Sequence, residues 1–318
     1  MRLPHNVTST IVIVLIAIAA QGAGDKRQVG QDRPVPSATM QAGVLHLEKF
    51  GSGEPALVFI PGLASGTWVW DAAIRQFSAT NTIYAVTLPG FDGTTPTSAP
   101  VLDKVDASLA QLIESEHLVR PVLVGHSIGG FIAIRFAEEH PEKLRGIVTV
   151  DGLPVLPPLS QMTADERAAA ARRTSAGLRT ATPEQFAKQQ QAVIPTMVTD
   201  PAQASHIASL TSRSNPAATA DYVEEMMDAD LRPSLAKDSV PTLVLAPVPS
   251  KPSPGYPPFM QNMTPQELSA TLMQFYQGLL VGAPHASVAP IANSLHFAMI
   301  DQSQAVNDAI ATFLKSVK

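Results

Sequence analysis

Five short runs in this chain are apolar throughout, and each ends at residues that favour turns. A Pro-Gly pair follows the first two runs, Gly125 follows the third, Asp151-Gly152 follows the fourth and Pro247 follows the fifth. Runs without polar–apolar alternation are typical of strands that are covered on both faces, as in parallel sheets. The candidate strands are Leu57–Ile60, Ile83–Leu88, Val122–Val124, Ile147–Val150 and Thr242–Ala246.

Helical patterns lie between these runs. Residues 103–116 place Val105, Leu109 and Leu112 on one helical face, and residues 127–140 carry apolar side chains at similar spacing. A chain in which strands and helices alternate forms a mostly parallel sheet flanked by helices. The sequence therefore predicts the α/β fold class.

Residues 156–235 interrupt the alternation, because they contain no strand-like run. Two helix-start signals occur there, a capping box at Thr163 and a Thr182 that is followed by proline and glutamate. About 80 residues between two parallel strands exceed a simple crossover connection. We therefore predict a helical cap, inserted after the strand that ends at Val150.

The N-terminus carries an apolar run of ten residues, Ile11–Ala20, preceded by Arg2 and followed by small and then charged residues. This pattern predicts a secretory signal peptide and an exported protein, either periplasmic or secreted. A membrane anchor is the alternative, but ten helical residues rise only about 15 Å, half the thickness of the hydrocarbon layer. We thus divide the chain into a signal peptide (1–23), a flexible polar leader (24–42), a core domain (43–155 and 236–318) and the cap (156–235).

Composition narrows the possible partners. The net charge of −5 without a basic block argues against nucleic acid, and we expect no stable membrane insertion after signal cleavage. The absence of cysteine excludes disulfides, thiol catalysis and thiolate metal sites. No metal-ligand spacing and no dinucleotide-binding glycine motif occurs. We expect a small-molecule substrate, no cofactor and no metal.

The pentapeptide Gly125-His126-Ser127-Ile128-Gly129 lies between a candidate strand and a candidate helix. A Gly-x-Ser-x-Gly motif in this context is typical of a strained turn that exposes a nucleophilic serine. The turn also directs the N–H groups of the helix N-terminus at the reacting centre. The motif predicts Ser127 as the nucleophile. The alternative is a glycine-rich turn whose serine takes no part in catalysis.

Five motifs occur in the order and spacing of the α/β-hydrolase superfamily, from about Val44 to the C-terminus. They are LVFIPGLASGTWVW, LPGFDG, GHSIGG, VDGLP and SLHFAMID. The chain resembles the capped esterase and lipase members. This resemblance implies the α/β-hydrolase fold and a serine hydrolase that cleaves a small carboxylic ester through an acyl-enzyme. A lactone or an activated amide is a further candidate substrate.

The same resemblance implies the catalytic base and acid. His296 follows the strand-like residues 286–291 and matches the histidine loop of the family, with His285 as its rival. The family usually places the acid after the penultimate strand, where this chain has no Asp or Glu until Glu267. A known variant places the acid one strand earlier, at Asp151, and neighbouring strands are close enough for this shift. Alternatively, Asp151 only caps a turn.

Two other carboxylates, Asp238 and Asp301, are weaker candidates for the acid, and Asp301 is also a candidate N-cap of a C-terminal helix over residues 302–315. An oxyanion hole requires two main-chain N–H groups. By resemblance these belong to Leu63, in Pro61-Gly62-Leu63, and to Ile128.

Large apolar residues near the motif loops and in the cap are candidates for a substrate pocket, although each is as well explained by core packing. They are Trp68, Trp70, Phe91, Tyr222, Met226 and Met227. Two other functions use the same fold. One is an acyltransferase, in which an alcohol replaces water. The other is a catalytically disabled binding protein.

Overall fold

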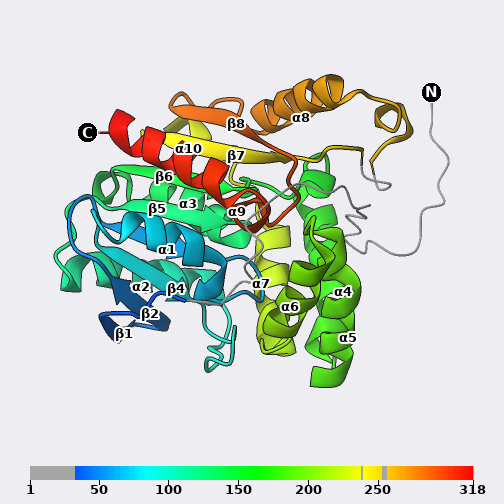
Figure 1. Ribbon diagram of the computed structural model, residues 1–318. Coiled ribbons are helices and arrows are strands. Elements are labelled where there is room, and N and C mark those ends of the chain that lie inside the picture. Colours follow the sequence, from blue (N-terminus) through cyan, green and yellow to red (C-terminus); the bar gives the residue numbers. More distant parts are fainter. Residues whose placement is uncertain (1–32, 238, 253–255, 318) are drawn as a thin grey trace.

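The computed structural model describes residues 33–237, 239–252 and 256–317 (Figure 1). The predicted signal peptide and residues 24–32 of the predicted leader lie outside the described residues. The described chain forms one eight-stranded sheet with helices on both faces (Figure 1). The predicted α/β fold is confirmed.

The sheet has the strand order β1-β2-β4-β3-β5-β6-β7-β8, in which β3 to β8 run parallel to one another. Every predicted strand is present, and its ends differ from the prediction by three residues or fewer. The strands are β1 (Ala38–Ala42), β2 (Leu45–Phe50), β3 (Leu57–Ile60), β4 (Ile83–Thr87), β5 (Val122–His126), β6 (Gly146–Val150), β7 (Thr242–Val248) and β8 (Ala286–Ala292).

The predicted leader is wrong at its end. Residues Ala38–Ala42 are not a flexible leader but the edge strand β1, which pairs with β2 in an antiparallel hairpin. Only Ala42 of this strand is buried, and its sequence ATMQA alternates apolar and polar residues instead of forming the apolar run of an inner strand. Its order comes from backbone hydrogen bonds to β2, and β2 in turn pairs antiparallel with β4.

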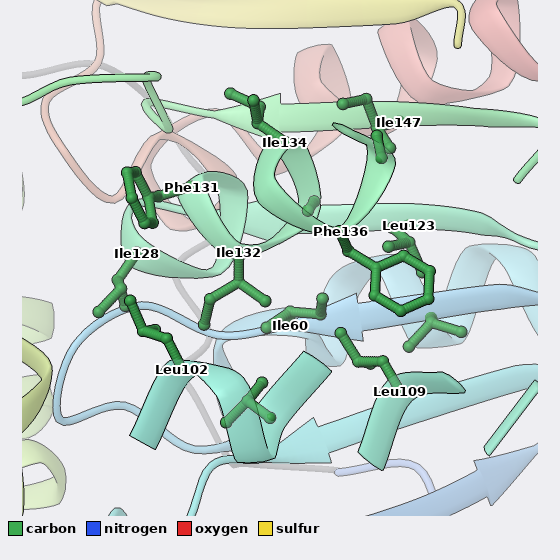
Figure 2. Close-up of a cluster of buried hydrophobic side chains, with 14 of the residues drawn as sticks. Ile60, Leu102, Leu109, Leu123, Ile128, Phe131, Ile132, Ile134, Phe136 and Ile147 are labelled. Atoms are coloured by element: carbon green, nitrogen blue, oxygen red, sulfur yellow. The ribbon is translucent and has the colours of Figure 1, made fainter. Parts of the chain in front are cut away.

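Apolar side chains cover both faces of the sheet. Alternate residues of β3 point to opposite sides, so Ile60 packs with α2 and α3 while Phe59 packs with α1 and α10. Figure 2 shows the first of these clusters, where Ile132 and Phe136 of α3 lie over Ile60 and Leu123. Burial on both faces explains why the inner strands have continuous apolar sequences.

The described α-helices are α1 (Asp71–Phe77), α2 (Val101–Ser115), α3 (Ile128–Glu139), α4 (Ala164–Arg179), α5 (Pro183–Val193), α6 (Pro201–Thr211), α7 (Pro216–Asp228), α8 (Pro265–Leu279), α9 (Ala298–Asp301) and α10 (Ser303–Ser316). Both predicted helix starts are confirmed, and Thr163 and Thr182 cap α4 and α5 through reciprocal capping boxes, of which the sequence predicts the one at Thr163.

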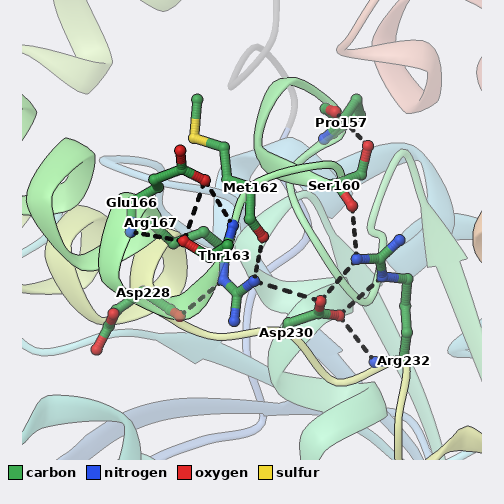
Figure 3. A network of polar contacts seen from close by, with 9 residues as sticks. All are labelled: Pro157, Ser160, Met162, Thr163, Glu166, Arg167, Asp228, Asp230 and Arg232. Carbon is green, nitrogen blue, oxygen red and sulfur yellow. Dashed lines mark hydrogen bonds and ion pairs between the residues drawn. The ribbon is translucent and has the colours of Figure 1, made fainter.

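Helices α4 to α7 lie between β6 and β7 and stand together at one end of the sheet (Figure 1). A polar network joins the two ends of this insertion (Figure 3). Arg167, at the start of α4, donates to the Asp228 carbonyl oxygen, and Arg232 donates to the Ser160 carbonyl oxygen at 2.7 Å. Asp230 forms ion pairs with both arginines. These contacts close the insertion into a compact unit above the core.

Among the described residues, no helix combines the length and apolarity needed to span a bilayer. The same residues contain no group of three or more His, Cys, Asp or Glu side chains arranged to hold a metal ion.

Candidate active site

Ser127 lies at the sharp turn between β5 and α3. Its backbone angles are φ 52° and ψ −119°, a conformation that residues other than glycine rarely adopt. The Ser127 N–H donates to the Val150 carbonyl oxygen at 2.9 Å. A Cβ at Gly125 would lie 2.2 Å from the Gly129 carbonyl oxygen, so the turn requires glycine there. This is the geometry that the Gly-x-Ser-x-Gly motif predicts.

His296 and Asp151 form a hydrogen-bonded pair, with 2.5 Å between His296 Nδ1 and Asp151 Oδ2. Their side chains are 17% and 14% exposed. Asp151 directly follows β6, the neighbour of β5, so the aspartate is on the same sheet edge as Ser127. The rival His285 precedes β8, which is parallel to β7, and is therefore at the opposite edge.

The two other candidate acids have different positions. Asp238 lies outside the described residues. Asp301 is buried at the end of α9, where its carboxylate accepts hydrogen bonds from the Leu295 N–H and from the Thr199 N–H and hydroxyl. Asp301 does not cap α10 as predicted, because these three donors already engage its carboxylate. The N-cap residue of α10 is Gln302.

His126 contacts the catalytic histidine candidate directly, a feature that the sequence reasoning did not assign. Its Nε2 lies 3.0 Å from the His296 carbonyl oxygen, which fixes the tautomer with the proton on Nε2. The two rings pack with their centroids 4.6 Å apart. Burial, and next the nearby charge of His296, lower the pKa of His126 well below its usual value. His126 is thus neutral and holds the His296 backbone in place.

Tyr276 of α8 also contacts the candidate site, a contact that the sequence did not predict. Its hydroxyl donates to Asp151 Oδ1, the carboxylate oxygen that does not face His296. Burial, and next the Asp151 charge, raise the pKa of Tyr276 well above its usual value, so the hydroxyl keeps its proton. A capping box at Thr264 and Glu267 is the sequence signal that could have indicated α8.

The segment after β3 approaches Ser127 closely. A Cβ at Gly62 would lie 3.3 Å from Ser127 Cβ, so the segment that contains the predicted oxyanion residue Leu63 runs close to the serine. Ile128 is the first residue of α3. In the described part of the chain, neither the Leu63 N–H nor the Ile128 N–H donates to a protein acceptor. Both N–H groups can therefore serve a ligand.

The predicted pocket residues divide among separate apolar clusters. Trp68 and Trp70 are buried with α1 and α10 on one face of the sheet. Phe91, Tyr222 and Met226 belong to the cluster on the other face, where the rings of Phe91 and Tyr222 are 4.8 Å apart. Met227 packs inside the cap with Leu159 and residues of α4. These six side chains are therefore distributed over three apolar clusters.

The segments that flank helix α6 of the insertion are hydrogen-bonded to the loops on both sides of the candidate site. Near its start, the Phe297 N–H donates to the Met197 carbonyl oxygen at 3.1 Å, next to His296. Beyond its end, the Ser214 hydroxyl donates to the Ala64 carbonyl oxygen at 2.9 Å, next to Leu63. The insertion therefore contacts the histidine loop and the candidate oxyanion loop together.

A family model described as "Alpha/beta hydrolase family" matches residues 57–309. This match covers most of the chain and includes Ser127, Asp151 and His296. The chain belongs to the alpha/beta hydrolase family. The resemblance inferred from the motifs is thereby confirmed.

Curated relatives match a shorter part of the chain. A pimeloyl-acyl-carrier-protein methyl ester esterase from Aeromonas hydrophila is 32% identical over 111 residues, which are 34% of this chain and 41% of that esterase. A (lyso)-N-acylphosphatidylethanolamine lipase from Mus musculus is 29% identical over 108 residues, 32% of each protein. The chain thus spans about two fifths or less of the length of these relatives.

Solved structures match over nearly the whole fold. A thermophilic esterase from Thermogutta terrifontis has a TM-score of 0.69 at 19% identity, covering 88% of this chain and 99% of that one. The enol-lactonase from Burkholderia xenovorans has a TM-score of 0.64 at 18% identity, covering 89% and 99%. At these identities the likeness establishes the fold.

Proposed function

We propose that this protein is a serine hydrolase that cleaves a small carboxylic ester, with Ser127 as nucleophile, His296 as base and Asp151 as the acid that orients the base. The observation that carries the proposal is the 2.5 Å contact between His296 and Asp151 at the sheet edge that also holds the strained Ser127 turn. A base held by a carboxylate beside a serine in this turn is the arrangement that activates a hydroxyl.

The reaction follows from these positions. His296 accepts the Ser127 proton on Nε2, because its Nδ1 is engaged by Asp151. The serine oxygen attacks the ester carbonyl carbon, and the Leu63 and Ile128 N–H groups stabilise the negative charge that develops on the carbonyl oxygen. His296 then protonates the leaving alcohol. Water, activated by the same histidine, hydrolyses the acyl-enzyme and regenerates Ser127.

The names of the relatives favour an ester as the substrate. The matched region of this chain is shared with methyl ester esterases and a lipase, and the fold is shared with an esterase and an enol-lactonase. A lactone has the same reactive carbonyl as an open-chain ester, so we include lactones in the substrate class. An acyltransferase would use the same residues with an alcohol as the acceptor.

The first test is an assay with p-nitrophenyl esters of increasing acyl length. Wild-type protein is expected to release p-nitrophenol, and Ser127→Ala to lower this rate by about 10³-fold or more, since loss of a catalytic serine removes the covalent route. Ser37→Ala is the matched control, because Ser37 lies just before the exposed edge strand β1. Hydrolysis that survives in Ser127→Ala would overturn the proposal. Added alcohols separate the two enzyme classes, since a transferase forms the new ester in preference to the free acid.

A further inference from the structure

The Asp151 carboxylate contacts two different donors, one on each oxygen. His296 Nδ1 is 2.5 Å from Oδ2, and the Tyr276 hydroxyl donates to Oδ1. We infer that Tyr276 is a positioning residue of the catalytic machinery, which holds the Asp151 carboxylate so that Oδ2 keeps facing His296 and thereby sets the histidine tautomer. This inference rests on the proposed function for its effect on rate, but the tautomer can be measured without any reaction.

The position of Tyr276 is well fixed. Helix α8 packs against β7 and β8, and Tyr276 is buried in the same apolar cluster as Leu279 and Leu280. Tyr276 as a residue is 7% exposed, so water is a poor substitute for its hydrogen bond to Asp151. No Asp or Glu follows β7 before Glu267, although the family usually has its acid just after this strand. The connection that follows β7 instead supplies α8, and α8 supplies a donor for the acid after β6.

The Tyr276 hydroxyl determines which atom of the side chain at position 151 faces His296 Nδ1. A carboxylate has two equivalent oxygens, so it accepts from Tyr276 and His296 together. An asparagine at this position has one oxygen and one NH₂ group. The buried Tyr276 O–H needs an acceptor, so it should hold the amide oxygen on its own side. The NH₂ group would then face His296 Nδ1 and drive the histidine proton to Nε2.

A histidine with its proton on Nε2 cannot accept the Ser127 proton there. We therefore expect Asp151→Asn to lower kcat by roughly several hundredfold or more, since the equivalent change in a serine protease costs about 10⁴-fold. With Tyr276→Phe added, the amide is free to rotate and present its oxygen to His296 Nδ1–H. The double variant should then be about 10-fold more active than Asp151→Asn alone, although Tyr276→Phe by itself should lower kcat by about 3- to 30-fold.

Tyr256→Phe is the matched control. Burial, and next the Asp151 charge, raise the pKa of Tyr256 to about 12, so this tyrosine is also near the acid. The hydrogen bond to Oδ1 nevertheless comes from Tyr276. Tyr256→Phe should therefore not restore activity to Asp151→Asn. A tyrosine that only fills space in the core would give a double variant no more active than Asp151→Asn, and that outcome would overturn the inference.

Nitrogen-15 NMR of the histidine ring supplies a readout that needs no turnover. We expect the His296 proton on Nδ1 in the wild type, on Nε2 in Asp151→Asn, and on Nδ1 again in the double variant, with circular dichroism confirming that each is folded. An unchanged tautomer in Asp151→Asn, or no return in the double variant, contradicts the role of Tyr276. If the tautomers change as expected but no ester is hydrolysed, the proposed function fails and the positioning role stands.

Discussion

Ser127 and Asp151 share an uncommon backbone conformation, with φ of 52° and 51°. Such positions cost of order 1–3 kcal/mol each for residues other than glycine, and they persist only where surrounding contacts fix them. Main-chain hydrogen bonds supply those contacts here, since Ser127 N–H donates to Val150 and Asp151 N–H donates to Leu245. Both residues directly follow the carboxyl end of a strand, β5 for Ser127 and β6 for Asp151.

At the residue scale, the structure also explains what the sequence could predict of the site. Ser127 was predictable because its strained turn requires glycines at fixed positions. Asp151 was predictable because β5 and β6 are adjacent, so the residues that follow them are neighbours. Tyr276 was not, because 125 positions separate it from Asp151 and only the packing of α8 brings the two together.

Asp106 of α2 provides a test of electrostatics away from the site. Its side chain is buried and forms an ion pair with Arg135 of α3. Burial outweighs the attraction of Arg135 and raises the pKa of Asp106 to about 7. Between the unfolded pKa and this value, the folded protein binds more protons than the unfolded chain. The Asp106 contribution to stability is therefore lost as the pH rises towards 7.

We predict that the difference in unfolding free energy between wild type and Asp106→Asn depends on pH. From pH 5 to pH 8 the wild type should lose about 2 kcal/mol relative to the variant, because asparagine cannot ionise. Urea unfolding at several pH values measures the difference. Asp103→Asn serves as a control, since Asp103 binds the same arginine but is exposed. A wild type that gains stability relative to the variant over this range would contradict the buried-acid account.

At the scale of elements, helix α6 joins two loops of the site. Its neighbour Ser214 donates to the Ala64 carbonyl oxygen and accepts from the Asp92 N–H at 3.0 Å. The preceding loop of α6 is hydrogen-bonded to Asp301 and to Phe297. The face of α6 that carries Ile207 is packed into the core cluster of α1 and α10. These contacts fix α6 and its flanking residues against the core domain, beside the candidate site.

Removal of the Ser214 hydroxyl should therefore disturb the candidate oxyanion loop. We expect Ser214→Ala to lower kcat by about 3- to 30-fold with a smaller change in KM, because a buried acceptor loses its donor beside Leu63. Ser209→Ala is the matched control, since Ser209 lies on α6 and its hydroxyl donates only within that helix, to His206. Steady-state kinetics on a p-nitrophenyl ester measures both. Equal, small effects of the two substitutions would show that α6 does not position the loop.

Elements with a strong local signal were predictable, and elements held by distant contacts were not. The inner strands appear as apolar runs because both of their faces are buried. β1 has one buried residue, and its order depends on pairing with β2. β7 continues through Pro247 because only β8 pairs with it there, β6 having ended opposite Leu245. A proline is tolerated where one side of the strand is unpaired.

At the scale of the whole molecule, the insertion and the core meet around the candidate site. The cap residue Glu225 accepts from the N–H groups of Val101 and Leu102 at the start of α2. Together with the contacts of α6, this places parts of the cap against the loops or helices that follow β3, β4 and β8. The sequence predicted an insertion between β6 and β7 from its length. It docks on the core through apolar side chains such as Ile207 and Met226. It also docks through single polar residues such as Ser214 and Glu225, and the polar residues carry no local sequence pattern.

Labelling with a fluorophosphonate probe measures whether Ser127 is a nucleophile activated by His296 and Asp151, as we propose. The probe reacts with activated serines, and peptide mass spectrometry locates the label. We predict that the wild type is labelled at Ser127, that Ser127→Ala is not labelled, and that His296→Ala is labelled far more slowly while remaining folded. Labelling at another serine, or no labelling of a folded wild type, would show that Ser127 is not the nucleophile.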